Sequence, residues 1–291
     1  MLNLILSTLT EGFIYALLAY GIFITYKILD FPDLTVDGSF PLGAAVTAVV
    51  INADVNPFLA LFISLCVGAL AGLCTGIIHV RLKVRDLLAG IITMTALFSI
   101  NLQIAGSNMS IIGKNTIFRL MPFGDMPQIY RKIIVAFVLA IVVKLVLDLY
   151  FKTQNGLLLR SVGDNENLVC TLGIDNGNMK ILGLVIANAL VALCGSVVCQ
   201  QQQSFNSTMG TGQMVFGLAA VIIGTTIFKK VSFVKGTTAV MVGSIVYKAC
   251  IQTAITLGLP ANLMKLITAV LFLVILVVGN LPSKKGGKKN A

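Results

Sequence analysis

Long runs of apolar residues, separated by short polar stretches, fill most of the sequence. A hydrocarbon core about 30 Å thick takes roughly 20 helical residues to cross, and nine runs are interpreted as spans on this basis. They are 5–27, 37–53, 57–79, 86–105, 131–152, 179–200, 213–228, 236–257 and 262–281. The ten-residue alternation of a transmembrane barrel is absent. The pattern predicts an all-α polytopic membrane protein with about nine transmembrane helices (eight to ten) in one domain, 1–291.

The amino-acid composition agrees with this pattern. Hydrophobic residues make up 57% of the 291 positions and charged residues 11%, whereas a soluble domain carries about 25% charged residues. A soluble globular protein is therefore excluded. The first basic residue is Lys27, so the N-terminus lacks the basic region of a signal peptide and is interpreted as an uncleaved first span.

Lysine and arginine are distributed unevenly over the segments between the predicted spans. With nine crossings, the basic residues of 106–132 share one side with the N-terminus, and most other basic loop residues lie opposite. Because cytoplasmic loops accumulate basic residues, the sequence predicts the N-terminus outside and the C-terminus inside. Residues 106–130 are then an external loop, 153–178 a cytoplasmic loop and 282–291 a basic cytoplasmic tail. The same distribution argues against nucleic acid as the reason for the net charge of +10.

No set of residues for catalysis or metal binding stands out. The sequence has no HExxH or GxSxG motif and no convincingly spaced pair of acids, so no catalytic residue is predicted. His79 is the sole histidine and the six cysteines are scattered, which predicts neither a metal site nor a disulfide framework. Residues 106–115, GSNMSIIGKN, lack the spacing of a phosphate-binding loop. We expect no cofactor in this chain; if ATP drives the protein, another chain binds it.

The most polar stretch inside the apolar sequence is LRSVGDNENLVCTLGI, residues 159–174. Asp164 is placed to cap a short helix, Glu166 adds negative charge to its first turn, and Gly173 is placed to end it. The apolar face of this helix holds Leu168, Val169 and Leu172. Because so short a helix is marginal in water, its apolar face needs a partner. Spacing alone slightly favours packing on the protein's own spans over docking to another protein.

Two further polar stretches adjoin predicted spans. In residues 30–43, Asp33 and Asp37 lie beside a short span. This indicates either a broken helix next to a water-filled transport path or an ordinary cytoplasmic turn, with equal weight. Residues 200–224 form a polar, Gly-rich loop that leads into a span, and indicate either an external vestibule or a solvated loop.

Charged and small residues within the spans allow simpler predictions. Lys144 and Asp148 are four residues apart and predict a local ion pair, whereas Lys248 and Glu11 have no evident partner. A ridge of glycines at spacing four predicts close helix packing, most often within one chain. It consists of Gly68, Gly72 and Gly76.

Taken in order, these stretches resemble one family, the permease subunits of bacterial ABC importers of the branched-chain amino acid and ribose type. An early family motif reads like IDLSVGS, and residues 33–39 are DLTVDGS. A late motif reads like AAVVIGG, and residues 219–225 are AAVIIGT, followed by a Gly-rich helix. The motif of the cytoplasmic loop is matched by Gly156, Arg160, Gly163, Asn165, Gly173 and Ile174. The departures are Asp37 in the early motif, Thr225 in the late one, and Leu168 with Val169 in place of two alanines.

The resemblance implies a transmembrane permease domain that forms the path of a small solute. By analogy, residues 164–173 form the coupling helix that docks in a groove of the ATPase. The residues assigned to coupling are Arg160, Gly163, Asp164, Asn165, Glu166, Leu168, Val169, Leu172 and Gly173. Those assigned to the translocation path are Asp33, Thr35, Asp37, Ser39, Gln213, Gly217 and Gly224.

The resemblance also implies a location and partners. The location is the bacterial cytoplasmic membrane. The partners are an ATP-binding cassette ATPase that holds ATP and Mg²⁺, an extracellular substrate-binding (lipo)protein, and a second permease copy in a homodimer. Among small solutes an amino acid is favoured, and compact permeases of this kind are associated with aromatic amino acids.

Two other classes of membrane protein compete with this interpretation. A secondary transporter driven by an ion gradient predicts two related halves with paired broken helices, whereas one candidate broken segment and no clear repeat is found here. The interpretation as a channel or a scaffold subunit does not explain the polar, helix-like loop 153–178. The sequence therefore favours an ATP-driven importer, with the secondary transporter as the alternative.

Overall fold

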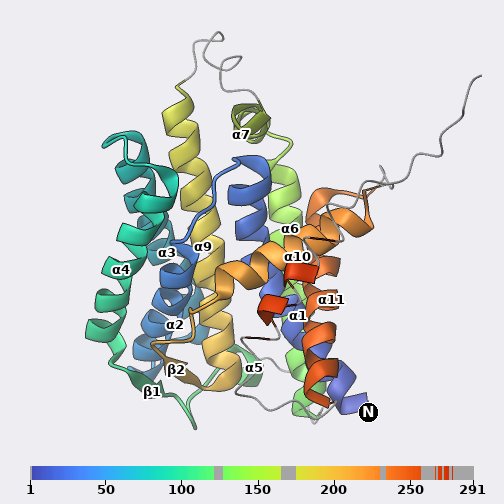
Figure 1. Cartoon of the computed structure of the whole chain (residues 1–291). Helices are drawn as coiled ribbons and strands as arrows, with labels where there is room; N and C mark the ends of the chain where they lie inside the picture. The colour runs from blue at the N-terminus through green and yellow to red at the C-terminus, as the bar shows by residue number, and fades with distance from the viewer. Residues whose placement is uncertain are drawn as a thin grey trace, which may run out of the picture.

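The structure is a computed structural model that describes residues 2–120, 127–164, 175–229 and 234–256, with residues 266, 268–270, 272–274 and 277 beyond them. Its helices form a bundle, and two short strands lie at one end (Figure 1). The elements are α1 (Leu2–Ile22), the π-helix η1 (Phe23–Ile28), α2 (Val36–Asn52), α3 (Pro57–Val80), α4 (Asp86–Ala105), β1 (Asn108–Ser110), α5 (Ile117–Leu120), α6 (Gln128–Tyr150), α7 (Gln154–Asp164), α9 (Asn176–Gln202), β2 (Ser204–Asn206), α10 (Gln213–Ile227) and α11 (Gly236–Thr256).

Each of the first eight predicted spans falls on a helix. In the described residues, six helices are long and apolar enough to cross a membrane, which confirms a multi-pass helical membrane protein. The helices of the second and seventh predicted spans, α2 and α10, have 17 and 15 residues and are shorter than a full crossing. Most of the ninth predicted span, 262–281, lies outside the described residues.

The helix α9 is the centre of the bundle. In its most apolar stretch 78% of the residues are buried, compared with 28% for α4 and for α6, which lie at the periphery. The glycine ridge of α3 packs against α9: a Cβ on Gly72 would collide with the carbonyl oxygen of Leu184, and one on Gly68 would lie 2.6 Å from that of Asn188. The ridge therefore serves packing within the chain, as predicted.

The N-terminal end of α2 lies inside the bundle. After η1, the chain returns from one end of the bundle toward its middle before α2 begins, and α10 runs obliquely across the other helices (Figure 1). Two short helices therefore start within the bundle. This geometry fits the broken-helix interpretation of residues 30–43 better than an ordinary surface turn.

The two ends of the bundle carry different connections. At one end β1 pairs with β2 in antiparallel register, with Met109 opposite Phe205, so the segments predicted as an external loop and an external vestibule meet. In the same segment α5 buries Ile117 and Phe118. The helix α7 lies at the opposite end (Figure 1). The predicted external and cytoplasmic loops are thus separated, as the alternation of spans requires.

The helix α7 was not predicted. The sequence pattern placed a helix start at Asp164, which is the last residue of α7. The missed signal is Thr153, whose Oγ1 accepts a hydrogen bond from the Gly156 N–H at 3.3 Å and so caps the helix. The predicted helix at 165–172 lies outside the described residues.

Candidate functional site

A buried polar network surrounds the segment that precedes α2. The Asp33 carboxylate accepts hydrogen bonds from the Thr35 N–H at 2.9 Å and from Asn188 Nδ2 at 2.7 Å. The Ser39 hydroxyl donates to Asn188 Oδ1 at 2.8 Å, and the hydroxyls of Thr35 and Thr75 are 2.8 Å apart. All five residues are buried. Three predicted pathway residues, Asp33, Thr35 and Ser39, therefore meet at one point.

Two members of this network, Asn188 and Thr75, were missed from the sequence. Asn188 lies in the middle of α9 among apolar residues, in the segment VIANALVAL. A carboxamide in the centre of a span is costly unless it is bonded, and this position was a usable signal. Thr75 adjoins Gly76 of the glycine ridge, and its hydroxyl also donates to Ala71 O of its own helix at 3.2 Å. Nothing in its sequence context distinguishes it from a packing residue.

Asp37, in the first turn of α2, connects that helix to α10. Its carboxylate accepts hydrogen bonds from the backbone N–H of Gly212 at 3.0 Å and of Met214 at 2.8 Å. Gly212 is the N-cap of α10 and Met214 lies in its first turn, where helical N–H donors have no partner in their own helix. The contact also brings Asp37 next to Gln213, another predicted pathway residue. A single side chain thus fixes the two helix starts against each other.

A cavity of about 340 Å³, here the α2–α4 cavity, opens beside Asp37. It is lined by Asp37, Gly38, Pro41, Met94, Thr95, Phe98, Asn101, Ser207 and Thr211. Asn101 Nδ2 donates to the Gly38 carbonyl at 3.1 Å, while its buried Oδ1 has no hydrogen-bond partner among the described residues. Asn101 lies in the fourth predicted span and was not predicted as a site residue. The cavity can hold a small solute against a carboxylate and an unpaired acceptor.

A second cavity, the α10–α11 cavity of about 310 Å³, is also lined by the loop that precedes α10, and Thr211 of this loop lines both cavities. Lys248 lies in its wall, with Nζ 3.1 Å from a Glu11 carboxylate oxygen and 3.7 Å from the ring centroid of Tyr15. The structure thus pairs Lys248 with Glu11, which the sequence left without partners. Gln213 also lines this cavity, and its buried Oε1 has no hydrogen-bond partner in the part of the chain that the structure describes.

The predicted pathway glycines Gly217 and Gly224 lie in helix contacts, and neither lines the two cavities. A Cβ on Gly217 would collide with the Ile22 side chain, and one on Gly224 with the Ala239 carbonyl oxygen. The absence of side chains at these positions lets α10 lie directly on α1 and α11.

The predicted ion pair between Lys144 and Asp148 is present, with Nζ and Oδ2 3.4 Å apart. Asp148 has further partners that the sequence did not indicate. Lys235 Nζ lies 3.0 Å from its Oδ2, and the Thr237 hydroxyl donates to its Oδ1 at 2.6 Å. The carboxylate therefore ties α6 to the start of α11.

The described part of the coupling region packs on the beginning of the pathway segment. Gly163 of α7 is so close to η1 that a Cβ there would collide with the Ile28 carbonyl oxygen. The Arg160 guanidinium carbon lies 4.8 Å from the ring centroid of Phe151, which anchors α7 to the end of α6. Asp164 is exposed at the end of α7. The other predicted coupling residues lie outside the described residues: Asn165, Glu166, Leu168, Val169, Leu172 and Gly173.

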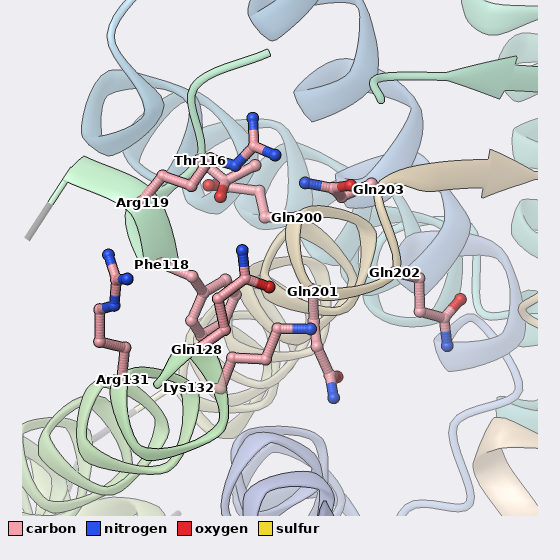
Figure 2. A pocket seen from close by; sticks show the side chains of 10 residues that line it. All are labelled: Thr116, Phe118, Arg119, Gln128, Arg131, Lys132, Gln200, Gln201, Gln202 and Gln203. Atoms are coloured by element: carbon pink, nitrogen blue, oxygen red, sulfur yellow. The ribbon is translucent and has the colours of Figure 1, made fainter. Parts of the chain in front are cut away.

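At the end of the bundle that carries β1 and β2, a pocket of about 270 Å³ has a basic rim (Figure 2). It is lined by Arg119, Arg131 and Lys132 together with four consecutive glutamines, 200–203 (Figure 2). The Gln200 carboxamide holds α5 in place by accepting the Ile117 N–H at 3.0 Å. Positive charge and amide groups together suit an anion. In the described residues, no group of three or more His, Cys, Asp and Glu is arranged to hold a metal ion.

Comparison with known proteins identifies the family. Residues 4–276 match the family described as "Branched-chain amino acid transport system / permease component". The chain belongs to this family. The match confirms the resemblance to permease subunits of ABC importers.

Several relatives of this permease are themselves named as transport proteins. It is 41% identical over 278 residues to a tyrosine transport system permease protein of Clostridioides difficile (strain R20291). This alignment covers 95% of this chain and 92% of the relative. A ribose import permease protein of Haemophilus influenzae is 26% identical, over 76% of this chain and 68% of the relative. A fructose import permease protein of Bifidobacterium longum is 25% identical, over 88% and 77%. No solved structure matches the chain.

Proposed function

We propose that the chain is the permease subunit of an ATP-driven importer for an aromatic amino acid, with tyrosine as the first candidate. The observation that carries the substrate class is the 41% identity, over nearly the full length of both chains, to a protein named as a tyrosine transport permease. The ribose and fructose relatives are more distant. They support the function as an importer but do not support an aromatic amino acid as the substrate. Family membership favours this function over the secondary transporter.

The proposed path runs past the starts of α2 and α10. Asp33, Thr35 and Ser39 hold the segment before α2 through Asn188, while Asp37 holds the start of α10. The α2–α4 and α10–α11 cavities flank this junction, and Thr211 lines both. Polar groups and cavities inside an otherwise apolar bundle are the features that a path for a polar solute needs. Gly217 and Gly224 contribute by fixing α10 in its oblique position.

The proposed coupling route begins at α7. In the importer, an ATPase that binds ATP and Mg²⁺ docks on residues 164–173 and moves them when its state changes. The contact between Gly163 and Ile28 transmits a displacement of α7 to η1, because close-packed backbones cannot absorb it. The segment after η1 carries Asp33, so the motion reaches the proposed path within a few residues.

The proposed orientation follows from the two ends of the bundle. The end with α7 faces the cytoplasm and the ATPase, in agreement with the excess of basic residues in the predicted cytoplasmic segments. The end with β1 and β2 faces outside, where an extracellular binding protein delivers the solute. The basic rim formed by Arg119, Arg131 and Lys132 suits a partner with acidic side chains. A second copy of the chain completes the assembly, in a bacterial cytoplasmic membrane.

Purification of the tagged chain from its native membrane in mild detergent, followed by mass spectrometry, tests this function. We expect a stoichiometric ATPase with Walker motifs, and an extracellular binding protein in the same sample or encoded beside it. That binding protein should bind tyrosine more tightly than ribose in calorimetric titration. A chain that repeatedly purifies alone would contradict the importer, and a binding protein selective for a sugar would contradict the substrate class.

A further inference from the structure

The α2–α4 cavity contains a carboxylate that no cation neutralises in the described part of the chain. Asp37 is half-buried in the cavity wall, and its hydrogen bonds come from the uncharged backbone N–H groups of Gly212 and Met214. None of the ion pairs among the described residues includes Asp37. A carboxylate inside a membrane protein is costly without a positive partner, so this charge calls for an explanation.

Capping of α10 explains the position of Asp37 but only part of its charge. A helix N-terminus carries the equivalent of about half a positive charge, which offsets the carboxylate incompletely. The two backbone donors occupy two of roughly four lone-pair sites on the carboxylate, so further donors can bind. The remaining negative charge faces the cavity.

Asn101 provides a second acceptor in the same wall. Its side chain has 0% exposure, and the bond from Nδ2 to the Gly38 carbonyl fixes the orientation of the carboxamide, since a flip would place two oxygens together. Oδ1 is therefore the atom left without a donor. Buried acceptors are rarely left unpaired, and capping by Asp37 does nothing for this one.

The two acceptors are complementary to an ammonium group. An ammonium brings three N–H donors and the missing positive charge, whereas a hydroxyl or an amide brings donors alone. Pro41, Met94 and Phe98 supply apolar surface in the same cavity, and the flexible side chain of Met94 can move to admit a ligand. The cavity thus offers acceptors for a cationic head and an apolar wall for the rest of the molecule.

We propose that the α2–α4 cavity binds the ammonium group of a primary amine, with the Asp37 carboxylate and Asn101 Oδ1 as its acceptors. The identity of that amine as a transported amino acid rests on the proposed function. The other buried charges do not compete for this role. Lys248 already supplies an ammonium to the α10–α11 cavity, and Asp33 is enclosed by its own donors at 2% exposure.

The test uses the purified full chain with the partners that remain bound, but without the binding protein. Thermal unfolding is followed in the presence of tyramine, which has the amine and lacks the carboxylate, or of 4-hydroxyphenylpropionate, which has the carboxylate and lacks the amine. We expect millimolar tyramine to raise the unfolding temperature and 4-hydroxyphenylpropionate to leave it unchanged. Asp37→Asn should weaken tyramine binding at least about tenfold, because a charged acceptor becomes a neutral one. Asn101→Leu, which leaves both backbone bonds of Asp37 in place, should weaken it several-fold.

Asp54→Asn is the matched control, because Asp54 lies just beyond the other end of α2 and is paired with Lys114. This variant should bind tyramine like the wild type. Equal stabilisation by the two compounds, stabilisation by neither, or unchanged tyramine binding in Asn101→Leu would overturn the proposal, even if Asp37→Asn did not fold. Loss of the site with ATP-driven tyrosine uptake intact would leave the proposed function standing. Purification without an ATPase would remove that function whatever the amine result.

Discussion

Asp148 and Asp37 are two aspartates of the same bundle with opposite surroundings. Asp148, on α6, is 8% exposed and is held by two lysines and the Thr237 hydroxyl. Asp37, at the start of α2, is half-buried beside a cavity and receives only backbone N–H groups in the described part of the chain.

The difference separates a charge that holds the fold from a charge that is available. All strong partners of Asp148 lie in the chain, so its removal leaves lysines behind and adds nothing to a ligand site. Asp37 keeps open acceptor sites that face a cavity, so its carboxylate can bind a ligand that enters and leaves this cavity. We therefore expect the effect of a mutation to fall as the lost partners become easier to replace with water.

Asp148→Ala should have the largest effect on stability. It leaves Lys144 and Lys235 without their carboxylate, and breaking a buried pair costs roughly 3–5 kcal/mol. Because Lys235 is partly exposed, we expect about 3 kcal/mol, the lower end of this range. Denaturant unfolding in detergent measures the loss. Asp37→Asn under the same conditions should lose less than half as much, and the reverse order of the two variants would break the comparison.

Asn188→Ala should be the next most damaging change. It removes a donor from the buried Asp33 carboxylate and the acceptor of the Ser39 hydroxyl. A buried charged group that loses a donor costs about 2–3 kcal/mol, and transport should fall with it because Asp33 is no longer fixed.

The control for this prediction is Ser196→Ala on the same helix, which removes one neutral hydrogen bond to Thr47 and should cost about 1 kcal/mol. Unfolding and uptake are measured on both variants. An Asn188→Ala protein with wild-type uptake would show that the polar network serves only the fold.

Gly163→Ala tests the connection between α7 and η1. The new methyl group collides with the Ile28 carbonyl oxygen, and overpacking of this kind costs about 1–3 kcal/mol. We expect the variant to retain its ATPase and to lose most ATP-driven uptake. Ser161→Ala, on the same helix, should keep both. Normal uptake by Gly163→Ala would exclude this contact as the coupling route.

Lys248→Met should have the smallest effect of the four. The methionine keeps the apolar stem between Tyr15 and Phe216, and Glu11, with 37% exposure of its side chain, can recover hydration. We expect a loss of about 1 kcal/mol, as for a partly exposed ion pair, in the same unfolding assay. A loss as large as that of Asp148→Ala would mean that solvent exposure does not determine how much each ion pair contributes to the free energy of unfolding.

The helices that follow a clear hydrophobic pattern were predicted well from the sequence. The spans that became α3, α4, α6, α9 and α11 are long apolar runs, and their type follows from the thickness of a bilayer. Asp33, Asp37 and Gln213 were recognisable because polar residues beside a proline or glycine interrupt apolar runs. The Lys144–Asp148 pair followed from helical spacing alone.

The remaining contacts join residues that are far apart in the sequence, and the spacing of residues along the chain does not show which of them become neighbours. Asn101 and Asn188 are single polar residues in spans, and their importance appears only when Gly38 and Asp33 are found beside them. Lys248 and Glu11 are far apart in the sequence, and only the packing of α1 against α11 brings them together. Thr153 was overlooked as a helix cap because the polar residues that follow it are typical of a loop, and α7 was therefore not predicted.

The most direct test of the proposed importer is uptake of labelled tyrosine by proteoliposomes that contain the chain with its co-purified ATPase and binding protein. We predict accumulation that requires ATP and the binding protein, that unlabelled aromatic amino acids reduce, and that ribose leaves unchanged. Uptake that persists without ATP and collapses with an ion gradient would contradict it and restore the secondary transporter.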